Sequence, residues 1–296
     1  MKLKIEIMFS VLIFLLVLAA TSSGIFWKTP GAPIIHTTMR GEQVTYQGSG
    51  LYRYDPAPYA LEGIIWDVVN LAVGLPLLGV AIFLSQRNSL RGRLLLGGLL
   101  FYFGYAYLMY MTGVAFNRLF LVYIAIFGLC GVTFFLNLSQ IDVAHLPEQI
   151  SPRFPRRLFI GFAFLFSAVL TFLWMGRILP IMISERFPPE AAGATTLVSQ
   201  ALDLGMVVPL LLSAGILLWR RSPWGALLTA ISLTHGLMMF ISIPAWIVIP
   251  LIQEGKINLL EAVPILPLIG VGLALAGLFF RNVQGTGQQT SPAVGM

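Results

Sequence analysis

The stretch from Trp66 to Leu95, WDVVNLAVGLPLLGVAIFLSQRNSLRGRLL, decides how this chain is organised. It places an acid, Asp67, and an amide, Asn70, in an apolar run that reaches a proline and ends in a basic turn. A second stretch of the same design, SQALDLGMVVPLLLSAGILLWRRSPWGALL, runs from Ser199 to Leu228. Apolar runs of about 20 residues cross the hydrocarbon of a bilayer as helices. Both stretches therefore predict membrane-spanning helices that carry polar groups.

The composition predicts an all-α polytopic membrane helix bundle. Hydrophobic residues make up 57% of the chain and charged residues only 10%, against about 25% in soluble domains. The expected partner is the lipid bilayer, whereas nucleic acid is excluded because no basic stripe is interleaved with exposed aromatics. The single cysteine, Cys130, has no partner for a disulfide or a thiolate metal site. No motif indicates a metal, a cofactor or a catalytic centre.

Hydropathy predicts about eight transmembrane helices. They are expected at 5–27, 61–84, 94–112, 119–138, 158–182, 195–218, 224–252 and 259–280. The first could instead be a signal peptide, because Lys2 and Lys4 precede an apolar run that ends in LAATSS. We favour a retained helix, since the apolar run continues through Phe26.

The segments between the spans differ in character. The longest, 28–60, is polar, and the alternation at Val44 and Tyr46 before a Gly-Ser-Gly turn predicts a short strand. We interpret this segment as a cap on the helix ends, with a lid over a ligand cavity as the alternative. Residues 139–157 form an amphipathic connector, and residues 282–296 have a composition that does not build a core.

Lys and Arg side chains indicate the orientation. If the N-terminus is cytoplasmic, eleven of them lie inside and six outside, and Arg177 lies within a span. This bias follows the positive-inside rule. It predicts that both termini are inside and that the protein is a multi-pass protein of the bacterial inner (cytoplasmic) membrane.

The two opening stretches indicate an internal duplication. Pro76–Leu95 aligns with Pro209–Leu228 without a gap, and ten of the twenty positions are identical, including Arg87/Arg220 and Gly92/Gly225. Copies four spans apart share one orientation, which predicts two parallel four-helix halves, 1–138 and 158–281. Transporters built from such repeats place their sites between the halves.

Several motifs also resemble a family of bacterial multi-span membrane proteins. They are YQGSGLYRYDPAPYALEG at 46–63, WDVVNLAVGLPLL at 66–78, SLRGRLLLGG at 89–98, FNRLFLVYIAIFGL at 116–129 and LDLGMVVPLLLSAG at 202–215. The resemblance implies a membrane fold and no particular activity, because none is established for that family.

Ionisable side chains inside a span are functional candidates, because burying them in lipid is costly. In the alignment Asn70 matches Asp203 and Asp67 matches Gln200, so each copy has one acid and one amide three residues apart on the same helix face. We expect these four side chains to form an outward-facing cluster, a ligand site or an ion-pair network, with Arg118 and Arg177. The first pairing we expect is Asp67 or Asp203 with Arg177. The alternative is that the cluster only holds the helices together.

His235 is the other polar candidate, and its counterpart in the first copy is Tyr102. These two residues are a possible proton relay, although a single histidine in a span is more often a packing residue.

Three functions remain open from the sequence. The leading hypothesis is a small-molecule or ion permease, or a ligand-binding membrane protein, with an outward-facing polar site. A membrane-embedded enzyme that acts on a lipid or isoprenoid is the second, and a structural or assembly subunit is the third. The ligand would be a small molecule, an ion or a lipid.

Overall fold

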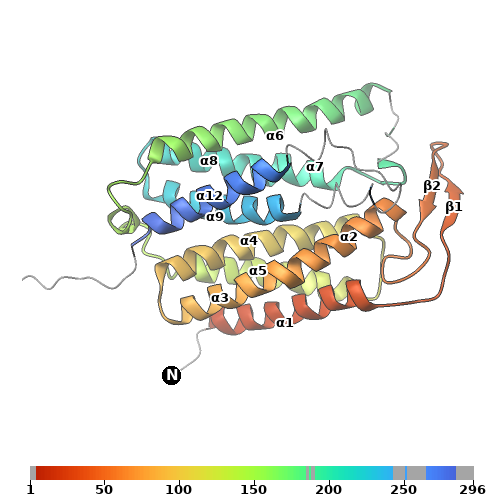
Figure 1. Ribbon diagram of the computed structural model, residues 1–296, viewed down its shortest axis with the longest axis horizontal. Helices are drawn as coiled ribbons and strands as arrows, with labels where there is room; N and C mark the ends of the chain where they lie inside the picture. Colours follow the sequence, from red (N-terminus) through yellow and green to blue (C-terminus); the bar gives the residue numbers. More distant parts are fainter. Residues whose placement is uncertain (1–4, 185–186, 188–190, 243–250, 252–264, 285–296) are drawn as a thin grey trace, which may run out of the picture.

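The computed structural model describes residues 5–184, 187, 191–242, 251 and 265–284, which form a bundle of antiparallel helices (Figure 1). Seven helices in this part of the chain are long and apolar enough to cross a membrane. The elements are α1 Ile5–Phe26, β1 Ile34–Thr37, β2 Gln43–Tyr46, α2 Ala57–Val69, η1 Asn70–Gly74, α3 Leu75–Gln86, α4 Leu90–Gly113, α5 Phe120–Leu138, η2 Leu146–Gln149, α6 Arg156–Ser184, α7 Val198–Leu202, η4 Asp203–Val207, α8 Val208–Trp219, α9 Pro223–Ser242 and α12 Ile265–Asn282.

The structure confirms the expected bundle of long apolar helices. Each of the first six expected spans corresponds to a long apolar helix, although α2, η1 and α3 together begin at Ala57, four residues earlier than expected. The seventh is α9, whose expected continuation beyond Ser242 falls almost wholly outside the described residues. The first six residues expected in the eighth span also lie outside them, and the rest forms α12.

Two buried helices, α4 and α9, lie at the centre of the bundle. In Figure 1 they separate α1, α2, α3 and α5, in the lower part of the view, from α6 and α8 in the upper part. At Gly98 of α4, an added Cβ atom would overlap the side chain of Thr234 on α9. A small residue at such a crossing lets two membrane helices approach closely.

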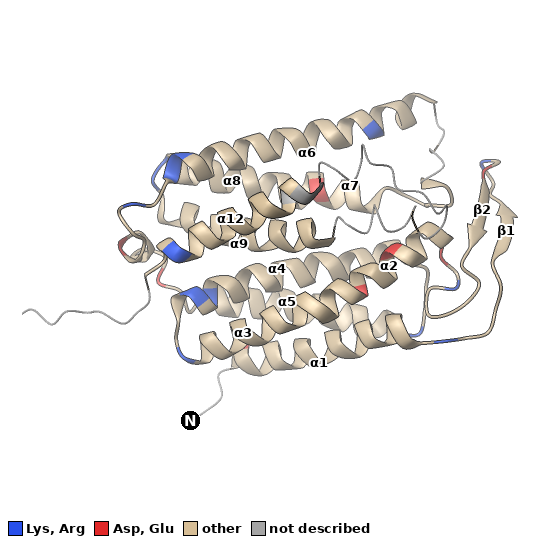
Figure 2. Cartoon of the chain, in the orientation of Figure 1, with Lys and Arg blue, Asp and Glu red and all other residues tan. Residues whose placement is uncertain are grey.

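Lys and Arg residues gather at one end of the bundle, which we call the basic end (Figure 2). Helix α1 begins there and α12 ends there (Figure 1). The Glu6 carboxylate of α1 lies 3.7 Å from the Arg93 guanidinium of α4, and both side chains are buried. At the same end, the Ser151 N–H donates to the Asn282 carbonyl and the Gln284 N–H donates to the Gln149 carbonyl. These contacts attach the connector to the end of α12.

Elements of the two related stretches begin and end at positions 133 residues apart. The pairs are Asn70 and Asp203 at the start of η1 and η4, Leu75 and Val208 at the start of α3 and α8, Gln86 and Trp219 at their ends, and Leu90 and Pro223 at the start of α4 and α9. Within the hairpins, Asn88 and Arg221 both have a positive φ, 55° and 57°. A left-handed residue just after a helix is a common way to end it. The two hairpins therefore turn in the same way.

The polar segment 28–56, which we call the cap, lies at the opposite end of the bundle, the cap end. Its strands pair antiparallel, with His36 opposite Val44, so the strand expected around Val44 is confirmed. The Arg40 side chain donates to the Ala194 carbonyl over 3.0 Å. At the end of the cap, buried Asp55 accepts a hydrogen bond from the Ala115 N–H over 2.7 Å. Burial raises the pKa of the Asp55 carboxyl from 3.8 to about 6.

Candidate functional site

Wide turns interrupt the two related helices where the polar residues lie. Segments η1 and η4 are π-helical, and each is followed by a proline in the first turn of the next helix, Pro76 or Pro209. Proline has no N–H to donate to the preceding turn, and a π-helical turn accommodates the break without ending the helix. Turns of this kind occur frequently at functional sites. They begin at Asn70 and Asp203, which the alignment had placed at equivalent positions.

Asp67 lies in the last turn of α2 and is 1% exposed. Its Oδ2 accepts a hydrogen bond from the Tyr52 hydroxyl over 2.5 Å, and its Oδ1 accepts one from the Tyr110 hydroxyl over 3.1 Å. Gly24 of α1 lies against this carboxylate, because a Cβ atom added at Gly24 would overlap Asp67 Oδ2. The cap, α1 and α4 therefore together enclose the acid.

Asn70 lies one turn further along and is also fully buried. Its Oδ1 accepts a hydrogen bond from the Tyr102 hydroxyl over 2.8 Å, and its Nδ2 has no partner among the described residues. The Tyr102 ring stacks on Trp66, with ring centroids 6.4 Å apart. The amide and the acid on this helix therefore use different tyrosines of α4.

Asp203 begins η4 and is 6% exposed. Its Oδ1 accepts a hydrogen bond from the Tyr105 hydroxyl over 2.7 Å, and its Oδ2 accepts one from Trp174 Nε1 over 2.8 Å. Tyr105 lies on α4 and Trp174 on α6. The second acid therefore has one donor from the central helix α4 and one from α6.

Sequence reasoning missed four of these donors, Tyr52, Tyr105, Tyr110 and Trp174. Of the tyrosines in the third span it selected only Tyr102. The available signal was the spacing of Tyr102, Tyr105 and Tyr110 in one span, since buried tyrosines usually find a hydrogen-bond partner. Tyr52 and Trp174 had no comparable signal, because nothing in the sequence brings them next to an acid.

The ion pair expected between Arg177 and Asp67 or Asp203 does not form among the described residues. Both carboxylates accept hydrogen bonds from neutral aromatic donors instead, and the Arg177 guanidinium lies 5.7 Å from the centre of the Trp174 ring. The Arg118 guanidinium carbon lies 5.6 Å from the centre of the Trp27 ring, near the cap. The Gln200 backbone carbonyl accepts the Asp203 N–H, but among the described residues its side chain forms no hydrogen bond with either acid. Five of the six expected residues thus separate into two acid sites, an amide site at Asn70 and two arginines on aromatic rings.

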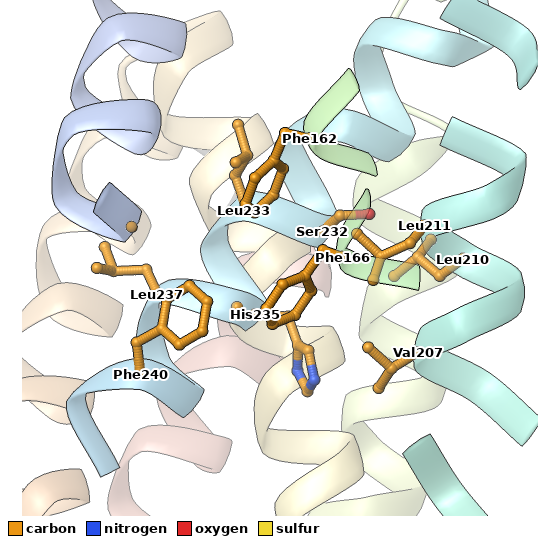
Figure 3. A pocket seen from close by; sticks show the side chains of 12 residues that line it. Phe162, Phe166, Val207, Leu210, Leu211, Ser232, Leu233, His235, Leu237 and Phe240 are labelled. Atoms are coloured by element: carbon orange, nitrogen blue, oxygen red, sulfur yellow. The ribbon is translucent and has the colours of Figure 1, made fainter. Parts of the chain in front are cut away.

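His235 of α9 packs against the two tyrosines that donate to Asp203 and to Asn70. It is 1% exposed, and neither ring nitrogen has a hydrogen-bond partner among the described residues. Its ring centroid lies 4.9 Å from that of Tyr105 and 6.1 Å from that of Tyr102. A cavity of about 20 Å³ adjoins it (Figure 3), lined otherwise by apolar side chains and Ser232. This volume suffices for one water molecule.

In comparisons with known proteins, no family model, curated protein or solved structure matches the chain. Within the described residues, no group of three or more His, Cys, Asp and Glu side chains is placed to hold a metal ion.

Proposed function

We propose that the protein is a small-molecule permease of the bacterial cell membrane whose transport is coupled to protonation of Asp67 and Asp203. The observation that carries the proposal is the environment of these acids. Each is buried inside an apolar helix, each accepts hydrogen bonds from two neutral aromatic donors, and neither has a basic partner among the described residues.

Neutral donors stabilise a carboxylate but leave its charge inside the bilayer, where an uncompensated charge costs several kcal/mol. Uptake of a proton or a cation by such an acid removes this cost. Asn70, at the equivalent position of the first stretch, accepts one tyrosine hydroxyl with its single amide oxygen. At position 203 both carboxylate oxygens accept a hydrogen bond, one from Tyr105 and one from Trp174, and an amide could accept at only one of them. Unlike Asn70, Asp203 can also exchange a proton.

The frame we propose for this permease has eight spans in two parallel four-helix halves, with both termini in the cytoplasm. Three observations support it. The element bounds repeat at an offset of 133, α1 begins at the same end at which α12 finishes, and Lys and Arg residues gather at that end. In this frame the cap end faces outward. Asp67 follows the start of α2 by ten residues and so lies about 15 Å below that end.

The experiment uses proteoliposomes that contain the full chain and a trapped pH indicator. Amino acids, sugars, organic acids and amines are added outside, and the internal pH is followed after each addition. We expect at least one compound class to drive a proton flux, and we expect Asp67→Asn and Asp203→Asn to abolish it. Asp142→Asn is the matched control, because it removes the same charge from an exposed side chain of the connector.

A flux that survives both substitutions would assign the acids a structural role only. If no compound drives a flux, permease function is rejected. Turnover of lipid or isoprenoid substrates by the same vesicles would then support the enzyme hypothesis. A stoichiometric partner from native membranes would support the assembly hypothesis.

A further inference from the structure

A cleft of about 380 Å³ opens at the cap end, between the end of α1 and the cap. Its volume falls within the range of ligand pockets, roughly 300–1,000 Å³. The side chains that give it polar character are Lys28, Thr29, Gln47 and Ser49, and Trp27 and Tyr52 contribute aromatic surface. The cleft is therefore amphipathic and large enough for a small organic molecule.

The walls of this cleft are held by contacts within the cap. Thr29 Oγ1 accepts a hydrogen bond from the Gly50 N–H over 2.9 Å and also lies 3.2 Å from the Gly50 carbonyl oxygen, to which it can donate. The backbones at Gly31 and Gly48 approach each other so closely that a Cβ atom at either position would overlap a carbonyl oxygen of the other segment. The cleft is thus formed before any ligand arrives, which reduces the entropy cost of binding.

The electrostatics of the cleft favour an anion. Lys28 is the one Lys or Arg in its lining, and the lining contains neither Asp nor Glu. Arg118 lies over the ring of Trp27, one of the lining residues, and adds a second positive charge nearby. Ile25, Leu51 and Ile64 provide apolar surface beside these charges. A ligand with one anionic group and a short apolar part would complement both features.

The inner wall of the cleft adjoins the first acid site. Gly24 and Tyr52 line the cleft, and the same two residues touch the Asp67 carboxylate, Gly24 by close packing and Tyr52 through its hydroxyl. A molecule in the cleft is therefore separated from Asp67 by the side chain of Tyr52. Displacement of that phenol would remove one of the two donors to the acid.

We propose that this cleft is the outer binding site for a small organic anion, a carboxylate or a phosphate, with Lys28 as its charge partner and Tyr52 as its link to Asp67. The proposal names the substrate class of the permease and to that extent rests on the proposed function, but the binding step itself depends only on the cleft. The same chemistry would recognise the phosphate of an anionic lipid headgroup, and the test separates the two sources.

The test measures binding to the full chain in nanodiscs of phosphatidylcholine alone. The probes are benzoate, succinate, inorganic phosphate and glycerol 3-phosphate, with benzamide and glycerol as neutral analogues. We expect at least one anion to bind and both neutral analogues to fail. Lys28→Gln should weaken that binding at least tenfold, Lys28→Arg should restore most of it, and Asp142→Asn should leave it unchanged. Lys28 is exposed, so these variants should keep the wild-type unfolding temperature, which is measured alongside.

A second arm repeats the measurement with phosphatidylglycerol in the nanodiscs and detects retained lipid by native mass spectrometry. Retention that is lost in Lys28→Gln, without binding of any soluble anion, would assign the anion site to a lipid headgroup. The proposal is overturned if neither soluble anions nor phosphatidylglycerol bind, or if Lys28→Gln binds as the wild type does. Anion binding without proton flux in the proteoliposomes would reject the permease function and retain the anion site in the cleft. Proton flux that is independent of Lys28 would reject the anion site and retain the permease function.

Discussion

The Tyr105 hydroxyl of α4 donates a hydrogen bond to Asp203 Oδ1 of η4 over 2.7 Å, across 98 positions of the sequence. The same helix carries Tyr102, which donates to Asn70, and Tyr110, which donates to Asp67. One central helix therefore supplies a donor to Asp67, Asn70 and Asp203, and the acid of the second stretch depends on a tyrosine that follows the first stretch.

Tyr105→Phe should destabilise the protein by about 1–3 kcal/mol, because it leaves a buried oxygen of Asp203 without its donor. Thermal unfolding in detergent, followed by intrinsic fluorescence, checks the expectation. Tyr54→Phe removes a hydroxyl from an exposed tyrosine and is the control. Equal unfolding temperatures for the two variants would show that the bond to Asp203 contributes nothing measurable.

The two hairpins should respond alike to alanine. In Gly92→Ala the new Cβ would lie 2.5 Å from Leu84 Cβ, and in Gly225→Ala it would overlap the backbone at Leu218. Backbone cannot move aside as a flexible side chain does, so we expect each variant to lose about 1–3 kcal/mol through overpacking. Gly128→Ala on α5 meets nothing within 4 Å and should be neutral or slightly stabilising. A large difference between the two hairpin variants would contradict the equivalence of these turns.

Asp55 should make stability depend on pH. Its pKa is about 6 in the folded chain and 3.8 without burial, so the folded state holds the proton more tightly. The resulting stabilisation is fully present below about pH 4 and is lost as the pH rises through about 6. The difference between these two pKa values corresponds to on the order of 2–3 kcal/mol.

Asp55→Asn keeps an oxygen for the Ala115 N–H and removes the titration. Unfolding temperatures between pH 4.5 and pH 8 should therefore fall less for this variant than for the wild type, and above pH 7 the variant should be the more stable of the two. Parallel curves for both proteins would refute a raised pKa at this position.

Glu6 and Arg93 should show strong energetic coupling. Their ion pair is buried at the basic end and joins α1 to α4. Glu6→Gln or Arg93→Met alone leaves one buried charge without its partner, at an expected cost of about 3–5 kcal/mol. The double variant should cost clearly less than the sum of the singles. A double-mutant cycle on the unfolding free energy measures this difference, and additive losses would show that the two side chains act independently.

The sequence predicted the apolar helices and the position of Asp67, Asn70 and Asp203 within them, because hydropathy and spacing are local properties. It could not predict the donors, since contacts between distant helices leave no periodic signal. Arg177 illustrates the limit. The expectation paired this arginine with Asp67 or Asp203 by charge, whereas in the structure Trp174, one turn earlier on α6, donates to Asp203. A neutral N–H satisfies the carboxylate there without burying a second charge.

The wide turns at Asn70 and Asp203 have a consequence for the rotational phase of their helices. A π-helical turn contains one residue more than an α-helical turn, which offsets the residues before it from those after it by about 100° around the axis. The extra residue therefore rotates the helix face that carries Asp67 relative to the faces of α3. It rotates the face that carries Gln200 relative to the faces of α8 in the same way. Deleting one residue from either turn would restore the regular period, and the polar side chains before it would then face a different neighbour.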